Sequence, residues 1–275
     1  MSLVVTIKSK LKNKLNSIEY RLASPWLNVW KTFYVNFRSF NFRDALKLPV
    51  LVYGPLRIYR LGKIVLDVPQ VEKGIVRIGI IDIKSYGNTA INNNGTIVFN
   101  GRCDIWGGTY IELSKEASLN IGCHSLICEN VRILLQGQCV IGKYVRLSYN
   151  SQIFDTDFHF MVNTESGEIK NCKSNVIIGD YSWIGNNTTI KKGTITPDYT
   201  IVAAPNAMLN KDYRNITSKY PVLGGSPAKE ISSGVRRIFS SSNENIIRKH
   251  FETTDTSYFM DIANIDEFCT INSIP

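Results

Sequence analysis

The sequence predicts an all-β protein: a parallel β-helix in which short strands wind into a triangular prism. Residues of inward type recur every six positions, whereas an α-helix repeats every 3.6 residues and a half-buried strand every 2. A small residue stands four positions after most of them, and Gly and Asn punctuate the chain from about residue 62. Repeats of fixed period are typical of solenoids. The series runs through Ile121, Ile127, Ile133 and Cys139, then, after a two-residue slip, Ile141, Leu147 and Ile153, and later Ile178, Ile184, Ile190, Thr196, Val202 and Met208.

The six-residue period has a simple physical meaning. Each short, flat strand ends at a corner, so one side of the prism needs one inward aliphatic residue. The small residue lies near the corner, where a large side chain would clash. Three sides make a coil of roughly 18 residues, and stacked coils pair their strands in parallel. The period does not give the handedness. The small residues of the last coils are Ser182, Thr188, Thr194, Thr200 and Asn206.

The chain divides into three parts by composition. Residues 1–61 are predicted to be a basic, aromatic extension, with an amphipathic helix over the first 25 residues. Residues 62–233 are predicted to form the β-helix, and residues 234–275 a helical tail. The repeat breaks between Ile153 and Ile178, and the gap is not a multiple of six. Part of the segment 154–175 must therefore leave the prism as a loop.

The positive charge of the chain is concentrated at one end. The formal charge is +9, and residues 1–70 contain 12 Lys and Arg but three acidic residues. This segment suits contact with acidic lipid headgroups or phosphorylated glycans, the alternative being a solvated basic face on an ordinary cap. No recognised nucleic-acid-binding motif accompanies the charge, so nucleic acid is not expected as a partner.

Several classes of protein are not supported by the sequence. No run approaches the ~20 apolar residues that span a bilayer, and the N-terminus lacks a secretion signal. We therefore expect a cytoplasmic protein, with peripheral contact at the inner membrane face through residues 1–60. The six cysteines form no CxxC pair and are expected to be free thiols. Gly-rich nucleotide motifs are absent, and three histidines in all offer no zinc triad, so no metal is expected.

Two stretches carry a resemblance to a known family. "IIGDYSWIGNNTTIKKGTI" and "GGSPAKEI" resemble the hexapeptide-repeat acyltransferases over about residues 75–235. "DTDFH" is similar to the polysaccharide and sugar O-acetyltransferases within that family, and the aromatic, basic extension looks like that of capsule and lipopolysaccharide acetyltransferases. The resemblance implies a left-handed β-helix, acetyl-CoA as donor, and a homotrimer with each cleft between two subunits.

His159 is the candidate general base, because it lies in the segment that breaks the repeat. Acyl transfer to a hydroxyl needs a base of near-neutral pKa to take the proton as the oxygen attacks the thioester. The resemblance places the catalytic histidine of the family here. Either Asp155 or Asp157 is expected to hold the other nitrogen of the imidazole. His124, in a hexapeptide turn, is expected to be structural, and His250 is expected to lie on a helix surface.

Trp183 is the second candidate, because it precedes inward Ile184 and should point away from the prism. Its indole would line the thioester cleft and donate to an oxygen of the substrate or transition state, the alternative being packing against another subunit. Small residues would leave room for the pantetheine arm, and late lysines would meet the CoA phosphates. The resemblance implies this cofactor-binding set: Trp183, Gly185, Ala203, Ala204, Lys211 and Lys229.

The sequence therefore predicts an acetyl-CoA-dependent O-acetyltransferase acting on a sugar of a surface polysaccharide or its precursor. Two other readings stay open: an N-acyltransferase of an amino sugar, and a non-catalytic β-helix that serves as an interaction scaffold. Pro205 departs from the family pattern by removing a backbone donor. The long segment 210–229 also departs from it, and both departures put the CoA contacts in question.

Overall fold

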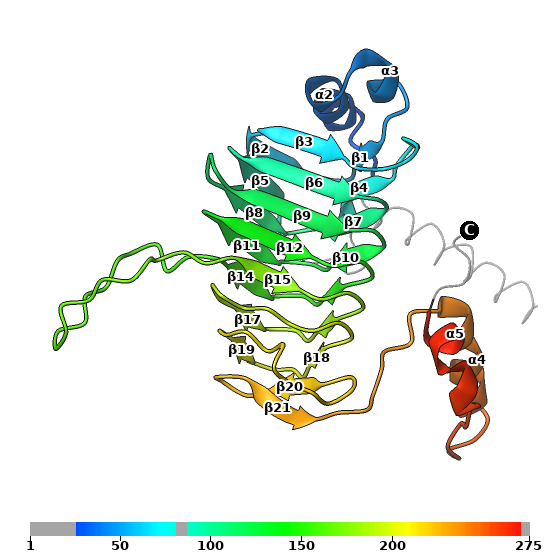
Figure 1. Cartoon of the computed structure of the whole chain (residues 1–275). Helices are drawn as coiled ribbons and strands as arrows, with labels where there is room; N and C mark the ends of the chain where they lie inside the picture. The colour runs from blue at the N-terminus through cyan, green and yellow to red at the C-terminus, as the bar shows by residue number, and fades with distance from the viewer. Residues whose placement is uncertain (1–25, 81–86, 271–275) are drawn as a thin grey trace, which may run out of the picture.

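The computed structural model describes residues 26–80 and 87–270. The predicted amphipathic helix over residues 1–25 lies outside them. Short strands wind into a three-sided prism with a helical cap at one end and a helical tail beside it (Figure 1). In Figure 1, strands β3, β6 and β9 run from left to right across the near face, and the chain then passes behind and one level down. This direction of winding makes the coil left-handed, as the family resemblance implies.

Each side of the prism is one sheet, and the strands of all three sides pair in parallel except at the last strand. The nine-stranded sheet contains β1 (Val50–Val52), β4 (Val76–Ile80), β7 (Cys103–Trp106), β10 (Ser125–Ile127), β13 (Arg146–Leu147), β16 (Trp183–Ile184), β18 (Ile201–Val202), β20 (Val222–Gly224) and the antiparallel β21 (Lys229–Ser232). The seven-stranded sheet contains β2 (Leu56–Arg60), β5 (Thr89–Asn93), β8 (Tyr110–Leu113), β11 (Arg132–Leu135), β14 (Gln152–Phe154), β17 (Thr189–Ile190) and β19 (Met208–Leu209). The five-stranded sheet contains β3 (Lys63–Leu66), β6 (Thr96–Asn100), β9 (Ser118–Gly122), β12 (Gln138–Ile141) and β15 (Val176–Ile178).

The coils begin at β1, before the expected boundary at residue 62. Strand β1 pairs with β4, and β2 pairs with β5. Val50 and Val52 are fully buried, whereas Arg57, Tyr59 and Arg60 are exposed. The exposed side chains give this first coil the composition of a basic surface, which is why its sequence reads as an extension.

The core follows the six-residue series with one correction. The predicted inward residues from Ile121 to Val202 are at most 3% exposed, and the two-residue slip is explained by β12, whose Cys139 and Ile141 both point inward. Met208 is only partly buried. Leu209, seven positions after Val202, takes the inward place and pairs with Ile190. The corner between β18 and β19 holds one residue more than the period allows.

The small corner residues make a recurring hydrogen bond. The hydroxyls of Ser182, Thr188, Thr194 and Thr200 are buried and each donates to the carbonyl oxygen three residues earlier, at 2.7 Å. Asn206 breaks this pattern because it lies in the enlarged corner and is exposed. The fourth position after each inward residue is thus set by both space and hydrogen bonding.

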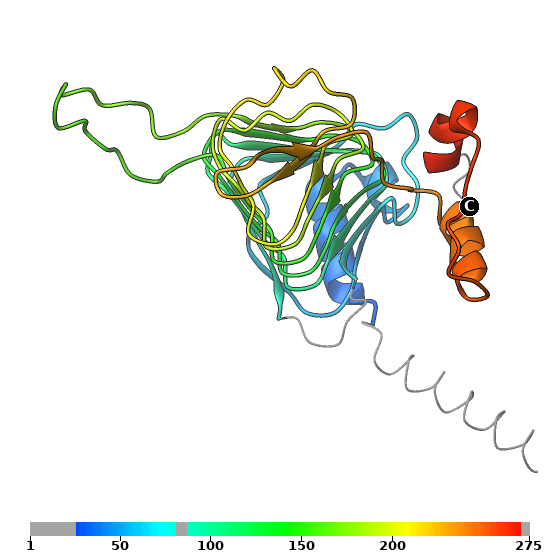
Figure 2. The same cartoon turned by 90° about the horizontal axis from the view of Figure 1, so that it is seen from below.

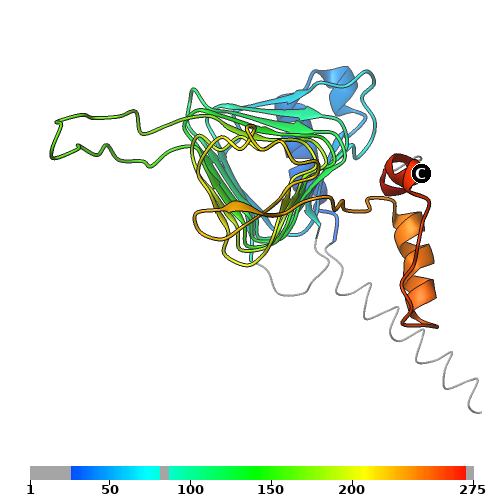
Figure 3. The ribbon, with the colours of Figure 1, turned by 60° about the horizontal axis from the view of Figure 1, so that its bottom comes forward.

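Helices lie at both ends of the described chain. The cap consists of α2 (Val29–Ser39) and α3 (Phe42–Ala45), next to β1. The tail leaves the prism after β21 and contains α4 (Ser241–Phe251), a 3-10 turn (Ile262–Asn264) and α5 (Ile265–Cys269). Seen along the prism, the tail lies on the side opposite a long excursion of the chain (Figure 2, Figure 3). Among the described residues, no helix has the length and apolar character needed to cross a bilayer.

Candidate active site

The break in the repeat produces a two-stranded arm that projects from the prism (Figure 1). It leaves after β14 and returns at β15, at the corner between the seven-stranded and five-stranded sheets. Backbone bridges join Thr156 to Lys173 and Val162 to Ile169, and the side chain of Asn163 accepts from two amides at the tip. The arm is therefore an ordered hairpin, and its sequence position agrees with the predicted departure from the prism.

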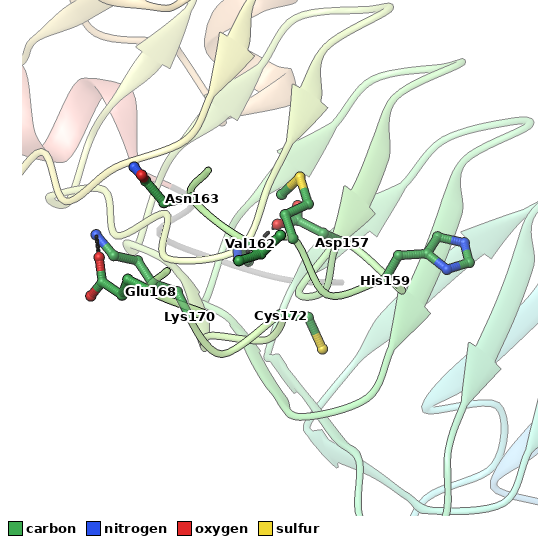
Figure 4. Close-up of a pocket in the computed structure, with 9 residues that line it drawn as sticks. Asp157, His159, Val162, Asn163, Glu168, Lys170 and Cys172 are labelled. Carbon is green, nitrogen blue, oxygen red and sulfur yellow. Dashed lines mark ion pairs between the residues drawn. The ribbon is translucent and has the colours of Figure 1, made fainter. Parts of the chain in front are cut away.

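His159 lies near the base of the arm and is exposed. Its side chain lines a cavity of about 450 Å³ beside the arm, but the imidazole points away from the other labelled residues (Figure 4). It forms no hydrogen bond with any of the described residues, so an imidazole nitrogen is free to take a proton. The other lining residues are Asp157, Met161, Val162, Asn163, Glu168, Lys170, Cys172 and Lys192.

Asp155 does not hold the imidazole of His159, which corrects one of the two alternatives for the orienting residue. Its carboxylate is buried and accepts hydrogen bonds from the amides of Gln136 (2.8 Å) and Gly137 (2.6 Å) on the preceding coil. Burial raises the pKa of Asp155, and these amide donors act in the opposite direction. Asp155 therefore closes the corner from which the arm departs.

Asp157 has other partners too, which corrects the second alternative. Its carboxylate lies 2.7 Å from the ammonium of Lys192 and 3.6 Å from that of Lys191. The hydrogen bond from Lys192 is the main cause that lowers the pKa of Asp157, and it outweighs burial. The backbone amide of Asp157 also donates to the carbonyl oxygen of Cys172 at 2.8 Å. Asp157 thus fastens the base of the arm to the coil below it.

Trp183 lies on β16 with its ring on the outer face of the nine-stranded sheet, as the phase of the repeat predicts. The ring is 38% exposed, and its Nε1–H donates to the Ser148 hydroxyl at 3.2 Å. The guanidinium of Arg237 lies over the indole, 5.0 Å from the ring centre. Arg237 also contacts Phe239, so the start of the tail packs beside Trp183.

Trp183 and His159 do not meet within one chain. Trp183 stands on the nine-stranded sheet, whereas the arm leaves from the corner that joins the other two sheets. In a three-sided prism this corner lies opposite the nine-stranded face. A site that uses both residues therefore requires a second copy of the chain.

The small residues proposed for the donor groove are partly committed to packing between coils. A Cβ at Gly185 would lie 2.6 Å from the carbonyl oxygen of Val202 and 2.8 Å from the amide of Ala204. The amide of Ala203 already donates to Leu223 at 2.8 Å. Ala204 is exposed. Of the three positions, Ala204 has the open surface that a thin ligand needs.

The two lysines expected to meet phosphates are exposed but stand on different elements. Lys211 follows β19 and lies 5.3 Å from the ring centre of Tyr213. Lys229 begins β21, opposite Gly224 in the sheet that carries Trp183. Lys229 is therefore placed on the face of Trp183, and Lys211 beyond the end of a strand of the seven-stranded sheet. Among the described residues, no group of three His, Cys, Asp or Glu side chains could hold a metal ion.

A stack of aromatic rings along one corner was not predicted. Successive ring centres lie 4.8 to 5.4 Å apart, and every member has a positive φ between 56° and 61°. The signal was present, since each ring stands third in a corner triplet such as Gly-Asp-Tyr or Pro-Asp-Tyr. Burial lowers the pKa of the one histidine in the stack, which supports its structural role. The stack consists of His124, Tyr144, Tyr181, Tyr199 and Tyr220.

The remaining chemistry-bearing residues agree with the sequence. All six cysteines are free, as predicted. His250 lies on α4, and its Nε2 is 2.8 Å from the carbonyl oxygen of Thr256. His250 does not line the cavity. Among the described residues, the only cysteine beside the cavity is the buried Cys172, so the thiols add no accessible nucleophile to the site.

The fold and its inserted arm define a class: left-handed β-helices built from hexapeptide repeats. No family model matches the chain. Over 87 residues the chain is 34% identical to a polysialic acid O-acetyltransferase of Neisseria meningitidis. The match covers 31% of this chain and 40% of the length of that relative.

The chain is also similar to several solved structures. The polysialic acid O-acetyltransferase OatWY is 21% identical with a TM-score of 0.47, over 72% of this chain and 98% of its own. The polysialic-acid-specific acetyltransferase NeuO is 16% identical with a TM-score of 0.48, over 78% and 91%. A hexapeptide-repeat acetyltransferase of Vibrio cholerae, complexed with acetyl coenzyme A, is 24% identical with a TM-score of 0.41, over 50% and 70%.

Proposed function

We propose that the protein is an acetyl-CoA-dependent O-acetyltransferase whose acceptor is a hydroxyl of a surface-polysaccharide sugar or its precursor. The observation that carries the proposal is His159, an imidazole without a partner among the described residues, on an arm that the break in the repeat ejects from the prism. The 34% identity to a polysialic acid O-acetyltransferase supports this acceptor class and reaction.

In the proposed reaction, His159 accepts the proton of the acceptor hydroxyl while that oxygen attacks the thioester carbonyl carbon of the donor. A new C–O bond forms and the carbonyl oxygen becomes negatively charged. When the tetrahedral intermediate collapses, the C–S bond breaks and the CoA sulfur takes the proton from the imidazolium. The acetyl ester and free CoA are the products, and the base is regenerated.

Trp183 is proposed to act on the oxyanion. Its single donor, Nε1–H, now binds the Ser148 hydroxyl at 3.2 Å and would turn to the developing negative charge. A well-placed donor of this kind is worth roughly 3–4 kcal/mol. Lys229 on the same face, together with Lys211, is proposed to meet the CoA phosphates, and the exposed Ala204 to flank the pantetheine arm. Gly185 and Ala203 are proposed to shape this groove through close packing.

A homotrimer is proposed to bring His159 of one subunit to Trp183 of the next. The arm supports this, because Phe160 and Met161, which follow His159, are 70% and 68% exposed and present an apolar surface that a partner subunit would cover. Since neither Asp155 nor Asp157 contacts the imidazole, the group that orients it is proposed to come from that partner. The cytoplasmic side of the membrane, where polysaccharide precursors are assembled, is the proposed location.

The test is the rate of CoA release by His159→Ala with acetyl-CoA and a panel of acidic and neutral polysaccharides. The exposed side chain can be removed without disturbing the core, so stability and oligomeric state should be unchanged. Loss of the general base should lower the turnover number by about 10²–10⁴-fold. His250→Ala, a histidine on the surface of α4, is the matched control and should keep the activity of the natural chain.

Three results would overturn this assignment. Full activity in His159→Ala would remove the base from the mechanism. Acetylation of amino-sugar nucleotides alone, with no ester formed on any hydroxyl, would favour the N-acyltransferase. Failure of the natural chain to bind CoA at all would favour a scaffold without catalysis.

A further inference from the structure

The cap helix α2 buries two polar residues beside Val35 and exposes aromatic ones. Thr32 and Asn36 are at most 1% exposed. The Thr32 hydroxyl accepts from the amide of Val52 at 3.0 Å. The Asn36 amide group accepts from Val50 N at 3.0 Å and donates to Val50 O at 2.7 Å. These side chains satisfy the free edge of β1, which would otherwise be open for pairing.

The opposite face of the cap is aromatic and lies in solvent. Its positions follow helical spacing along α2, and the same surface continues onto α3. Trp30 is 86% exposed and Phe42 is 70% exposed. We call this surface the cap face; its members are Trp26, Trp30, Phe33, Tyr34, Phe37, Phe42 and Leu46.

Basic side chains accompany the cap face. Lys31, Arg38, Arg43 and Lys47 lie on or beside the two helices, against a single acid, Asp44. The acid is held locally by the side chain of Asn41 at 2.7 Å. None of the four basic residues forms an ion pair with another of the residues 26–80 and 87–270. Their charges are therefore available to a ligand outside this part of the chain.

We propose that the cap face docks on an anionic lipid surface. Aromatic side chains favour the interfacial layer of a bilayer, and flanking Lys and Arg favour anionic headgroups. A second copy of the same face is disfavoured as the occupant, because symmetric pairing would bring two positively charged sets together. The inference goes beyond the proposed acetyl transfer and does not depend on it.

The position of the cap suits this role. The two helices cover the N-terminal end of the prism, and the arm leaves from its middle (Figure 1). Docking through the end would leave the arm and the nine-stranded face in water. A glycan that grows from a membrane-bound lipid would then be presented alongside the prism.

The test is sedimentation of the full chain with vesicles of phosphatidylglycerol and phosphatidylcholine in equal parts, compared with vesicles of phosphatidylcholine alone. The natural chain should bind the anionic vesicles, and binding should fall as salt is raised. The double variant Trp30→Ser, Phe42→Ser and the double variant Arg43→Glu, Lys47→Glu should each bind more than tenfold more weakly. All four side chains are exposed, so unfolding transitions should match those of the natural chain.

Matched control variants carry the same kinds of substitution at exposed positions outside the cap face. Phe259→Ser with Ile262→Ser removes two exposed apolar side chains from the tail, and Lys115→Glu with Lys249→Glu reverses two exposed charges. Both should bind as the natural chain does. Equal loss in the controls, or unchanged binding in the cap variants, would overturn the proposal, as would loss of binding only when residues 1–25 are removed. If the natural chain formed a dimer without lipid and the cap variants were monomeric, a second copy of the chain would be identified as the partner of the cap face.

Discussion

At the scale of single residues, the motif "DTDFH" at the base of the arm separates into parts with different physical roles. Asp155 accepts hydrogen bonds from two backbone amides of the coil above. Asp157 forms an ion pair with a lysine of the coil below. The side chain of His159 forms no hydrogen bond or ion pair with the described residues. Closely spaced acids near a histidine suggest an acid–base pair from the sequence. Here each acid instead fixes the direction in which the arm leaves the prism.

The ion pair of Asp157 makes the base of the arm sensitive to acid. Because the folded pKa is lowered, the ion pair stabilises above the unfolded pKa of about 3.9 and is lost as the pH falls through the folded value. We expect hydrogen-exchange protection at the Asp157–Cys172 backbone pair to fall below about pH 4. Asp157→Asn should show weaker protection already at neutral pH and no acid step.

Glu168→Gln is the control for this measurement, since Glu168 pairs with Lys170 in the outer arm, at 3.5 Å and in solvent. Its protection at the arm base should follow that of the natural chain. An acid step that persists in Asp157→Asn would show that another group titrates there.

At the scale of elements, the corner hydroxyls explain why the repeat prefers Ser and Thr to Ala or Gly. At each corner one backbone carbonyl oxygen accepts no hydrogen bond from a neighbouring strand. The hydroxyl three residues later donates a hydrogen bond to it, at 2.7 Å. The inward aliphatic residue and the corner hydroxyl are thus two halves of one unit. Removing either should lower the stability of the stacked coils.

Thr200→Val tests the corner unit, because valine keeps the shape and removes the donor to Pro197 O. The partly buried carbonyl of Pro197 loses its partner beside the fully buried Thr200 side chain, so we expect the free energy of unfolding to fall by about 1–3 kcal/mol in urea titration. Thr253→Val is the control: its hydroxyl makes the same three-residue contact with His250 O, at 2.9 Å in solvent. Water replaces that bond, and the change should stay within about 0.5 kcal/mol. Equal losses in both variants would refute a role for burial.

At the scale of the whole molecule, the prism separates the two halves of the proposed site. The arm leaves from one corner, and the tail packs beside Trp183 on the opposite face (Figure 3). Arg237 and Phe239 of the tail contact the surroundings of Trp183, so the tail belongs to the wall of the proposed donor groove. A single chain therefore carries the two halves of the proposed site on surfaces that face away from each other.

Mixed oligomers test the assembly of these half-sites. His159→Ala and Trp183→Ala should each be inactive alone. After denaturation and refolding together in equal amounts, roughly a quarter of the interfaces in a closed ring should join an intact His159 to an intact Trp183. Activity should therefore reappear on mixing. Mixtures that stay inactive while forming oligomers of normal mass would place both residues in one chain.

Much of this molecule is predictable from the sequence. The six-residue period predicts the inward residues because each side of the prism accepts one aliphatic side chain. The break in the repeat between Ile153 and Ile178 predicts the arm. The period gives the wrong inward residue at Met208, because a corner with one extra residue places Leu209 in the core instead. It also fails for the first coil, because the outward residues of β2 are basic and aromatic and hide the inward ones.

The sequence by itself determined the prism, its core and the ejection of the segment that bears His159, because these follow from local periodicity. Only the tertiary structure decided what each polar side chain binds. Asp155 and Asp157 are two residues apart yet contact different coils, Asn36 contacts a strand edge, and Arg237 contacts Trp183. Those contacts join positions that are distant in the chain, and stacking of coils brings them together at distances that no local pattern encodes.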